Sequence, residues 1–155
     1  METSAEQPAH ITERFDAPRR RVLFLCTNNS CRSQMAEAIL RHLASDRFES
    51  FSAGTNPTTV NPDAVAVLHE IGIDISAYRS KPVAVFAGQS FSYVITVCDQ
   101  AREQCPLFPG AGRQLHWSFE DPAKAKGNEQ ERRAFFRRVR DEITQHIRYL
   151  ISDYL

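Results

Sequence analysis

Short apolar runs recur along the chain, and each is bounded by small or polar residues. Continuous apolar runs of this length are typical of strands buried in a parallel sheet. The last of the four segments holds a short strand that runs into an Asp-Pro pair. The four runs are RVLFLC (21–26), FESFSAG (48–54), FSYVITVC (91–98) and QLHWSFEDP (114–122).

Segments with helical periodicity alternate with these runs. Residues 33–45 place apolar side chains at intervals of three and four. Residues 61–72 have Asn61 in the N-cap position, Pro62 in the first turn and Gly72 beyond the end, which is the usual punctuation of a helix. Residues 128–155 form a long amphipathic pattern, whose apolar face consists of Phe135, Phe136, Val139, Ile143, Ile147, Leu150 and Ile151.

Alternating strands and helices predict an α/β fold. We expect a three-layer sandwich in which helices flank a central, mostly parallel, four-stranded sheet. Residues 19–155 would form this single domain. Residues 1–18 are polar, contain two prolines and lack periodicity, so we interpret them as a flexible N-terminal extension.

Composition excludes several classes of function. The 155 residues include 19 basic and 19 acidic side chains, so the net charge favours neither nucleic acid nor membrane as a partner. The arginines of the last predicted helix alternate with acidic residues, as on an ordinary solvated face. The N-terminal residues lack the apolar h-region that is typical of a secretory signal, and no apolar run approaches the ~20 residues of a membrane span. We therefore expect a cytoplasmic protein. As a separate expectation, we predict a monomer.

The four cysteines fall into two close pairs, Cys26 with Cys31 and Cys98 with Cys105. In a reducing cytosol, such cysteines serve catalysis, redox chemistry or metal binding more often than structural disulfides. Their spacings, Cys-x4-Cys and Cys-x6-Cys, differ from the usual Cys-x2-Cys zinc knuckle. We therefore predict no metal site and no bound cofactor.

The loop between the first strand and the first helix carries the chemistry. Successive main-chain N–H groups at a helix N-terminus bind a tetrahedral oxyanion, and they also favour the thiolate form of Cys26. Arg32 offers a planar cation for two anion oxygens. Ser33 can donate its hydroxyl to the Cys26 sulfur while it caps the helix. The predicted anion-binding residues are Thr27, Asn28, Asn29, Ser30, Cys31, Arg32 and Ser33.

The sequence Cys26-x5-Arg32-Ser33 resembles the phosphate-binding loop of cysteine-based phosphatases. Its place near the N-terminus resembles the low-molecular-weight tyrosine phosphatases, and that likeness implies that Asp121, beside Pro122, is the general acid. Family loops often have Gly where Asn28 stands, and we expect a left-handed backbone there, which Asn tolerates. Asn29 matches the loop Asn that holds the family's loop in shape.

A second group of motifs resembles the thioredoxin-coupled arsenate reductases that share this fold. These motifs are CTNNSCRSQMAEA, VCDQAREQCP, HWSFEDPAKAKG and FFRRVRDEI. The resemblance implies that arsenate is the substrate, with phosphate or sulfate as mimics. It also implies a relay in which Cys26 attacks arsenate, Cys98 attacks Cys26 and Cys105 attacks Cys98. Thioredoxin, or a glutaredoxin with a low-molecular-weight thiol, would then reduce the last disulfide.

The relay makes a demand on the segment between its last two thiols. If residues 99–104 are helical, Cys98 and Cys105 lie roughly 10 Å apart, since each residue rises ~1.5 Å. A disulfide needs Cα atoms within about 4.4–6.8 Å. We therefore expect this segment to loop out during turnover.

Some reductases of this type hold a potassium ion beneath the loop. The residues that match its ligands are Asn29, Glu37 and Ser52, but Lys81 stands where an Asp completes the set. We therefore expect no potassium site, and an ion pair between Lys81 and Glu37 in its place.

Two other functions remain open at this point. A low-molecular-weight tyrosine phosphatase would use the same Cys26 loop and Asp121 through a phosphocysteine intermediate. Such phosphatases often carry an aromatic residue directly after the Asp-Pro pair, where this chain has Ala123. A redox-sensing or anion-binding module would keep the cysteines but would not explain Asp121. For Cys31, both a packing role and a protective disulfide with Cys26 are possible.

Overall fold

The computed structural model describes residues 18–99 and 107–153. Within them, four strands form one sheet in the order β2-β1-β3-β4, and all three pairings are parallel. This confirms the predicted sheet. The strands are β1 (Arg20–Cys26), β2 (Phe48–Gly54), β3 (Phe91–Thr96) and β4 (Ala111–His116).

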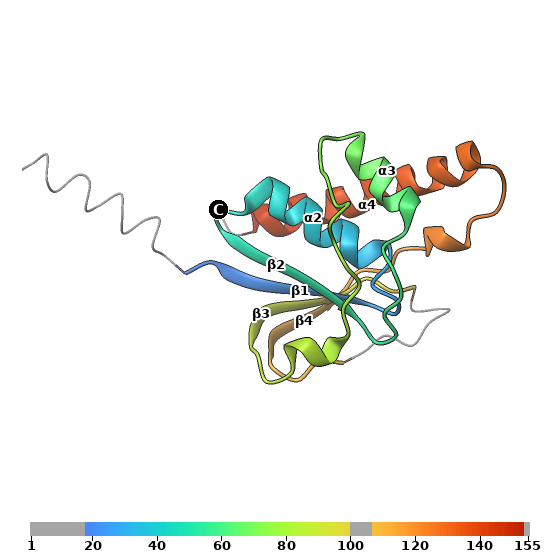
Figure 1. Cartoon of the computed structure of the whole chain (residues 1–155). Helices are drawn as coiled ribbons and strands as arrows, with labels where there is room; N and C mark the ends of the chain where they lie inside the picture. Colours follow the sequence, from blue (N-terminus) through green and yellow to red (C-terminus); the bar gives the residue numbers. More distant parts are fainter. Residues whose placement is uncertain (1–17, 100–106, 154–155) are drawn as a thin grey trace, which may run out of the picture.

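The two faces of the sheet are covered differently (Figure 1). One face is covered by the helices α2 (Arg32–Ala44), α3 (Pro62–His69) and α4 (Glu129–Ser152). The other carries a thinner layer that includes the 3-10 helix η1 (Val83–Phe86). A second short 3-10 helix, η2 (Pro122–Lys124), lies before α4. The result is the three-layer α/β sandwich that the sequence predicts.

Successive side chains of β1 point to opposite faces of the sheet and contribute to a separate core on each face. Val22 and Phe24 lie in the main core with the helices, whereas Leu23 and Leu25 lie in a second core on the opposite face. The second core contains four phenylalanines, whose rings meet edge to face at 5.5 to 5.8 Å between centroids. Those rings belong to Phe51, Phe86, Phe91 and Phe108.

The helix ends follow the predicted punctuation. The Asn61 side chain accepts a hydrogen bond from the Asp63 N–H at 2.8 Å, as an N-cap should. At the start of α4, Asn128 and Glu131 form a reciprocal capping box. The predicted apolar face of α4 is confirmed, and its fully packed members are Phe136, Val139, Ile143, Ile147 and Leu150.

Some boundaries differ from the prediction. β3 ends at Thr96, so Cys98 lies two residues beyond the strand instead of at its end. β4 already begins at Ala111, where the sequence Ala-Gly-Arg (111–113) gave no strand signal. The predicted extension, residues 1–18, lies outside the described residues except for Pro18.

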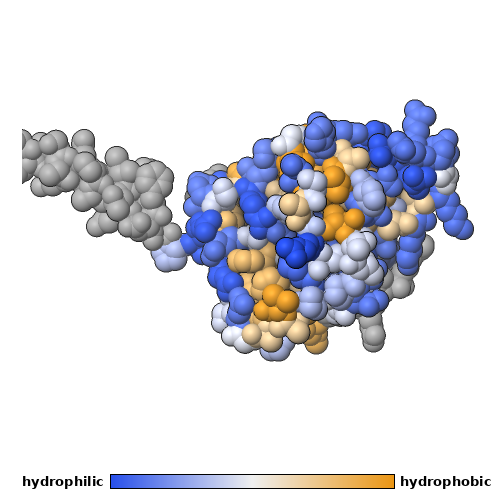
Figure 2. All heavy atoms as spheres, viewed as in Figure 1, coloured by the Kyte–Doolittle hydropathy of each residue, from blue (hydrophilic) through white to orange (hydrophobic). Residues whose placement is uncertain are grey.

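The described surface is mostly polar. On the face seen in Figure 2, hydrophobic residues form small areas between hydrophilic ones. The large hydrophobic side chains that are exposed are Ile71, Val85, Leu107 and Tyr149. In the part of the chain that the structure describes, no helix combines the length and the apolar character needed to cross a membrane.

Candidate active site

Cys26 is the last residue of β1 and opens the loop that leads into α2. Its side chain is buried, and the sulfur lies 2.8 Å from the Ser33 hydroxyl oxygen and 3.2 Å from the Asn29 main-chain nitrogen. The Asn29 N–H donates to the sulfur. The parallel sheet thus brings the thiol to the carboxyl edge of the strands, where α/β folds hold their ligands.

Asn29 fixes the shape of the loop. It is the one described non-glycine residue with positive φ, at 50°. The left-handed residue is therefore Asn29 and not Asn28, which corrects the sequence prediction. The expected side-chain hydrogen bonds of Asn29 are present: its Nδ2 donates to Ser33 Oγ at 2.8 Å and to Ser52 Oγ at 3.0 Å. Its Oδ1 accepts from the Lys81 N–H at 2.8 Å.

These contacts determine the direction of the hydrogen bond to Cys26. An amide nitrogen can only donate, so Ser33 Oγ accepts from Asn29 and keeps its own hydrogen for the sulfur. When Cys26 acts as a thiolate, Ser33 is therefore the donor in this contact, as predicted. The predicted capping role is wrong, because α2 begins at Arg32 and its N-cap is Cys31, without a side-chain cap.

A second loop, residues 55–61, holds the outer side of the Cys26 loop. Four carbonyl oxygens of the Cys26 loop accept main-chain hydrogen bonds from it, at 2.8 to 3.3 Å. These carbonyls therefore turn away from the centre of the loop. Gly54 permits the close approach, since a Cβ there would lie 2.6 Å from the Thr27 oxygen. The donor–acceptor pairs are Thr55–Cys26, Asn56–Thr27, Thr58–Asn28 and Asn61–Ser30.

Arg32 and Asp121 meet beside the thiol. The Arg32 side chain is 3% exposed; it donates to the Phe119 carbonyl at 3.3 Å and lies 3.6 Å from the Asp121 carboxylate. Asp121 also accepts from the Ala123 N–H at 3.0 Å, so its turn is fixed at the start of η2. A small pocket is lined by Cys26, Asn28, Ser30, Cys31, Arg32, Asp121 and Ala123.

Cys31 lies in the same pocket but differs chemically from Cys26. Burial raises the pKa of the Cys31 thiol to about 12, and the negative charge of Asp121 acts in the same direction. The Ser30 hydroxyl, 3.7 Å from the sulfur, opposes this only in part. At neutral pH Cys31 is therefore a thiol and a poor nucleophile.

Cys98 follows β3, the strand next to β1, and belongs to the same core as Cys26. Its side chain is fully buried, and its sulfur is 3.9 Å from the carbonyl oxygen of Leu25, the residue before Cys26. Both cysteines belong to the main core at the carboxyl end of neighbouring strands. Cys105, and the predicted looping out of residues 99–104 beyond Asp99, lie outside the described residues.

The predicted ion pair beneath the loop is confirmed. Lys81 Nζ lies 3.8 Å from Glu37 Oε1, and Arg41 donates to the other carboxylate oxygen at 2.6 Å. Burial lowers the pKa of Lys81, while the Glu37 charge counteracts this shift. Ser52 links this pair to the loop, because its hydroxyl donates to Glu37 and accepts from Asn29. Among the described residues, no group of three or more His, Cys, Asp or Glu side chains could hold a metal ion.

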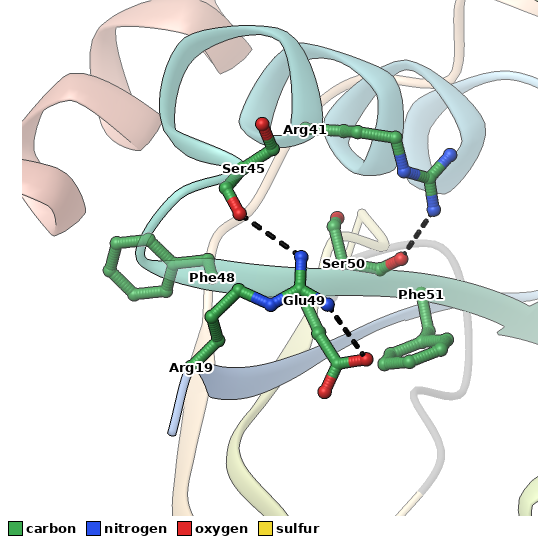
Figure 3. Close-up of a pocket in the computed structure, with 7 residues that line it drawn as sticks. All are labelled: Arg19, Arg41, Ser45, Phe48, Glu49, Ser50 and Phe51. Atoms are coloured by element: carbon green, nitrogen blue, oxygen red, sulfur yellow. Dashed lines mark hydrogen bonds and ion pairs between the residues drawn. The ribbon is translucent and has the colours of Figure 1, made fainter. Parts of the chain in front are cut away.

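A second hollow lies between α2 and β2, away from Cys26 (Figure 3). Its two arginines are engaged by the protein: Arg19 pairs with Glu49 at 3.3 Å and donates to the Ser45 carbonyl at 3.1 Å. Arg41 donates to the Ser50 carbonyl at 2.6 Å. Both arginines of this hollow are therefore already bound by groups of the protein itself.

Sequence reasoning found Cys26, Asn29, Arg32, Ser33 and Asp121, and the structure brings all five together. It missed the loop 55–61, whose Thr, Pro and Asn residues have no periodicity. It also missed the Phe119 carbonyl, because main-chain contacts leave no mark in a sequence.

A nucleophilic cysteine on an anion-binding loop, with an arginine and an aspartate beside it, defines a cysteine-dependent phosphatase-like protein. Residues 21–154 match low molecular weight phosphotyrosine protein phosphatases, and the chain belongs to that family.

Within the family, the chain groups with proteins named arsenate reductase. The arsenate reductase of Shouchella clausii (strain KSM-K16) is 46% identical over 127 residues, which cover 82% of this chain and 91% of that protein. A solved arsenate reductase in the phosphate binding state superposes with a TM-score of 0.72 at 29% identity, over 88% of this chain and 99% of that one. The solved thioredoxin-dependent arsenate reductase of Corynebacterium glutamicum superposes with a TM-score of 0.63 at 28% identity. The match covers 98% of this chain and 72% of that one.

Proposed function

We propose that the protein reduces arsenate to arsenite through a relay of three cysteines. The observation that carries this proposal is the presence of two buried thiols at one sheet edge. Cys26 is hydrogen-bonded in the lining of an anion pocket, and Cys98 lies two residues beyond the end of the neighbouring strand β3. A phosphatase needs only the first of them. The relatives named arsenate reductase support the same choice of substrate.

In the first step, the Cys26 thiolate attacks arsenic. The loop N–H groups and the Arg32 guanidinium hold the arsenate oxygens. Asp121 gives a proton to the departing oxygen, which leaves as water while the sulfur–arsenic bond forms. The product is a Cys26–arsenate adduct in which arsenic is still As(V).

Reduction occurs in the second step. The Cys98 thiolate attacks the Cys26 sulfur, and the electron pair of the sulfur–arsenic bond stays on arsenic. Arsenite leaves as As(III), and the two cysteines are oxidised to a disulfide. Cys105 then attacks Cys98, which restores the Cys26 thiolate and leaves a Cys98–Cys105 disulfide.

An external dithiol must supply the two electrons for the next cycle. We propose thioredoxin, as in the Corynebacterium glutamicum relative, with a glutaredoxin and a low-molecular-weight thiol as the other reductant to test. The chain needs no bound cofactor for these steps, because every electron passes through sulfur. Phosphate and sulfate should occupy the anion pocket as unreactive mimics.

The test is NADPH oxidation coupled through thioredoxin and thioredoxin reductase, with arsenate as substrate. We expect turnover by the wild type and none by Cys98→Ser, which should stop at the Cys26–arsenate adduct and release no arsenite. Hydrolysis of p-nitrophenyl phosphate serves as the internal control, because it uses the Cys26 loop without Cys98. No arsenate turnover, together with aryl phosphate hydrolysis that is the same in both proteins, would instead establish a tyrosine phosphatase.

A further inference from the structure

Asn28 occupies an unusual place at the mouth of the anion pocket. It lines the pocket together with Asp121 and Ala123, and its Nδ2 donates to the Asn56 carbonyl oxygen at 2.9 Å. Its φ is not positive, so the backbone there does not require glycine. The side chain is thus compatible with the loop conformation, and a hydrogen bond to the loop 55–61 holds it in place.

The chemistry of the carboxamide leaves one donor for a ligand. An amide nitrogen carries two hydrogens, and the contact with Asn56 uses one of them. The second hydrogen lies on the same fixed nitrogen, in a residue that lines the pocket. An anion in the pocket can therefore receive a hydrogen bond from Asn28 in addition to those from the loop main chain.

The position of this donor distinguishes two kinds of anion. A tetrahedral anion that is held by the loop N–H groups directs one substituent toward the mouth. In an inorganic oxyanion that substituent is an oxygen, which accepts a hydrogen bond. In a phosphate monoester it is the ester oxygen with its organic group, which needs more room than a single oxygen in a pocket that Asn28 lines. Among the described residues that line the pocket, none has an aromatic ring to bind a phenyl group.

We propose that Asn28 is a specificity-determining residue, which favours inorganic oxyanions over phosphate monoesters by donating to the outward oxygen and by narrowing the mouth. This inference rests on the proposed function for the identity of the reacting anion. The binding preference itself does not depend on the proposed function, because it can be measured with inorganic phosphate and a phosphate monoester.

The experiment compares Asn28→Ala and Asn28→Gly with the wild type. Calorimetric binding of inorganic phosphate and phenyl phosphate gives the preference in binding, and kcat/KM for arsenate and for p-nitrophenyl phosphate gives the preference in turnover. We expect the preference for the inorganic anion to fall about tenfold in both variants, which is the effect of one hydrogen bond to a charged group. If both variants lose the same preference, the loss comes from the missing side chain and not from a change in backbone flexibility.

Two further variants sharpen the test. Asn28→Asp keeps the size of the side chain but removes the donor, so phosphate binding should weaken while phenyl phosphate gains nothing. Thr59→Ala, an exposed residue of the loop 55–61, is the matched control and should leave the preference unchanged. An equal change for both anions in Asn28→Ala, or no change, would overturn the proposal. Absence of arsenate turnover in the wild type would refute the proposed function alone, because the phosphate comparison still reports on Asn28.

Discussion

The hydrogen bond from Ser33 to Cys26 makes a quantitative prediction. Ser33→Ala removes a hydrogen bond that reaches the sulfur, and both groups are buried, so water cannot easily replace it. A hydrogen bond to a charged group contributes ~1.5–3 kcal/mol. Since ~1.4 kcal/mol corresponds to a tenfold change, alkylation of Cys26 at a fixed pH should become about tenfold slower or more.

Alkylation by iodoacetamide measures this effect directly, because only the thiolate reacts at a useful rate. The tryptic peptide 22–32 contains Cys26 and Cys31, and fragmentation in the mass spectrometer distinguishes them. The raised pKa of Cys31 keeps that thiol silent at neutral pH. Ser45→Ala, the same substitution at the other end of α2, is the control. Alkylation of Cys26 at the wild-type rate in Ser33→Ala would refute the reasoning.

Three further predictions test other parts of the structure. Gly54→Ala should weaken phosphate binding about tenfold or more, measured by calorimetry, because the new Cβ displaces the loop; unchanged affinity would contradict this. Glu70 has its pKa lowered from 4.5 to about 2, chiefly by a hydrogen bond from Arg137. Glu70→Gln should therefore lower the urea midpoint above about pH 4.5, and the difference should disappear as the pH falls toward about 2; a pH-independent difference would refute the ion pair as its cause. The thermal midpoint should be equal in sodium and potassium buffers, because the Lys81 ammonium lies beside Glu37; a rise specific to potassium would contradict this.

The fold was predictable because its signals are local. The apolar run that ends at Cys26, the Asn61-Pro62 helix start and the long stripe of α4 each lie within one segment. The pairing of Arg32 with Asp121 was reached through a family resemblance and not through spacing, since 89 positions separate them. The second core was not predicted, because its four phenylalanines come from four separate segments.

The loop conformation shows the limit of reasoning from single residues. Both Asn28 and Asn29 tolerate a left-handed backbone, and the sequence offered no means to choose between them. The choice is made by contacts from elsewhere: the Lys81 N–H, the Ser52 hydroxyl and the Ser33 hydroxyl all bind the Asn29 side chain. Two of these partners, Ser52 and Lys81, are distant in sequence from Asn29, and Ser33 comes from the start of α2.

The outer hydrogen bonds between the loop 55–61 and the Cys26 loop have a kinetic consequence. Because those carbonyls are already engaged, the Cys26 loop holds its shape before any anion arrives. An entering anion spends none of its binding energy on ordering the backbone, and it needs no closing movement of the Cys26 loop. Capture can then occur at the first well-oriented encounter, so its speed depends on how often the anion reaches the pocket.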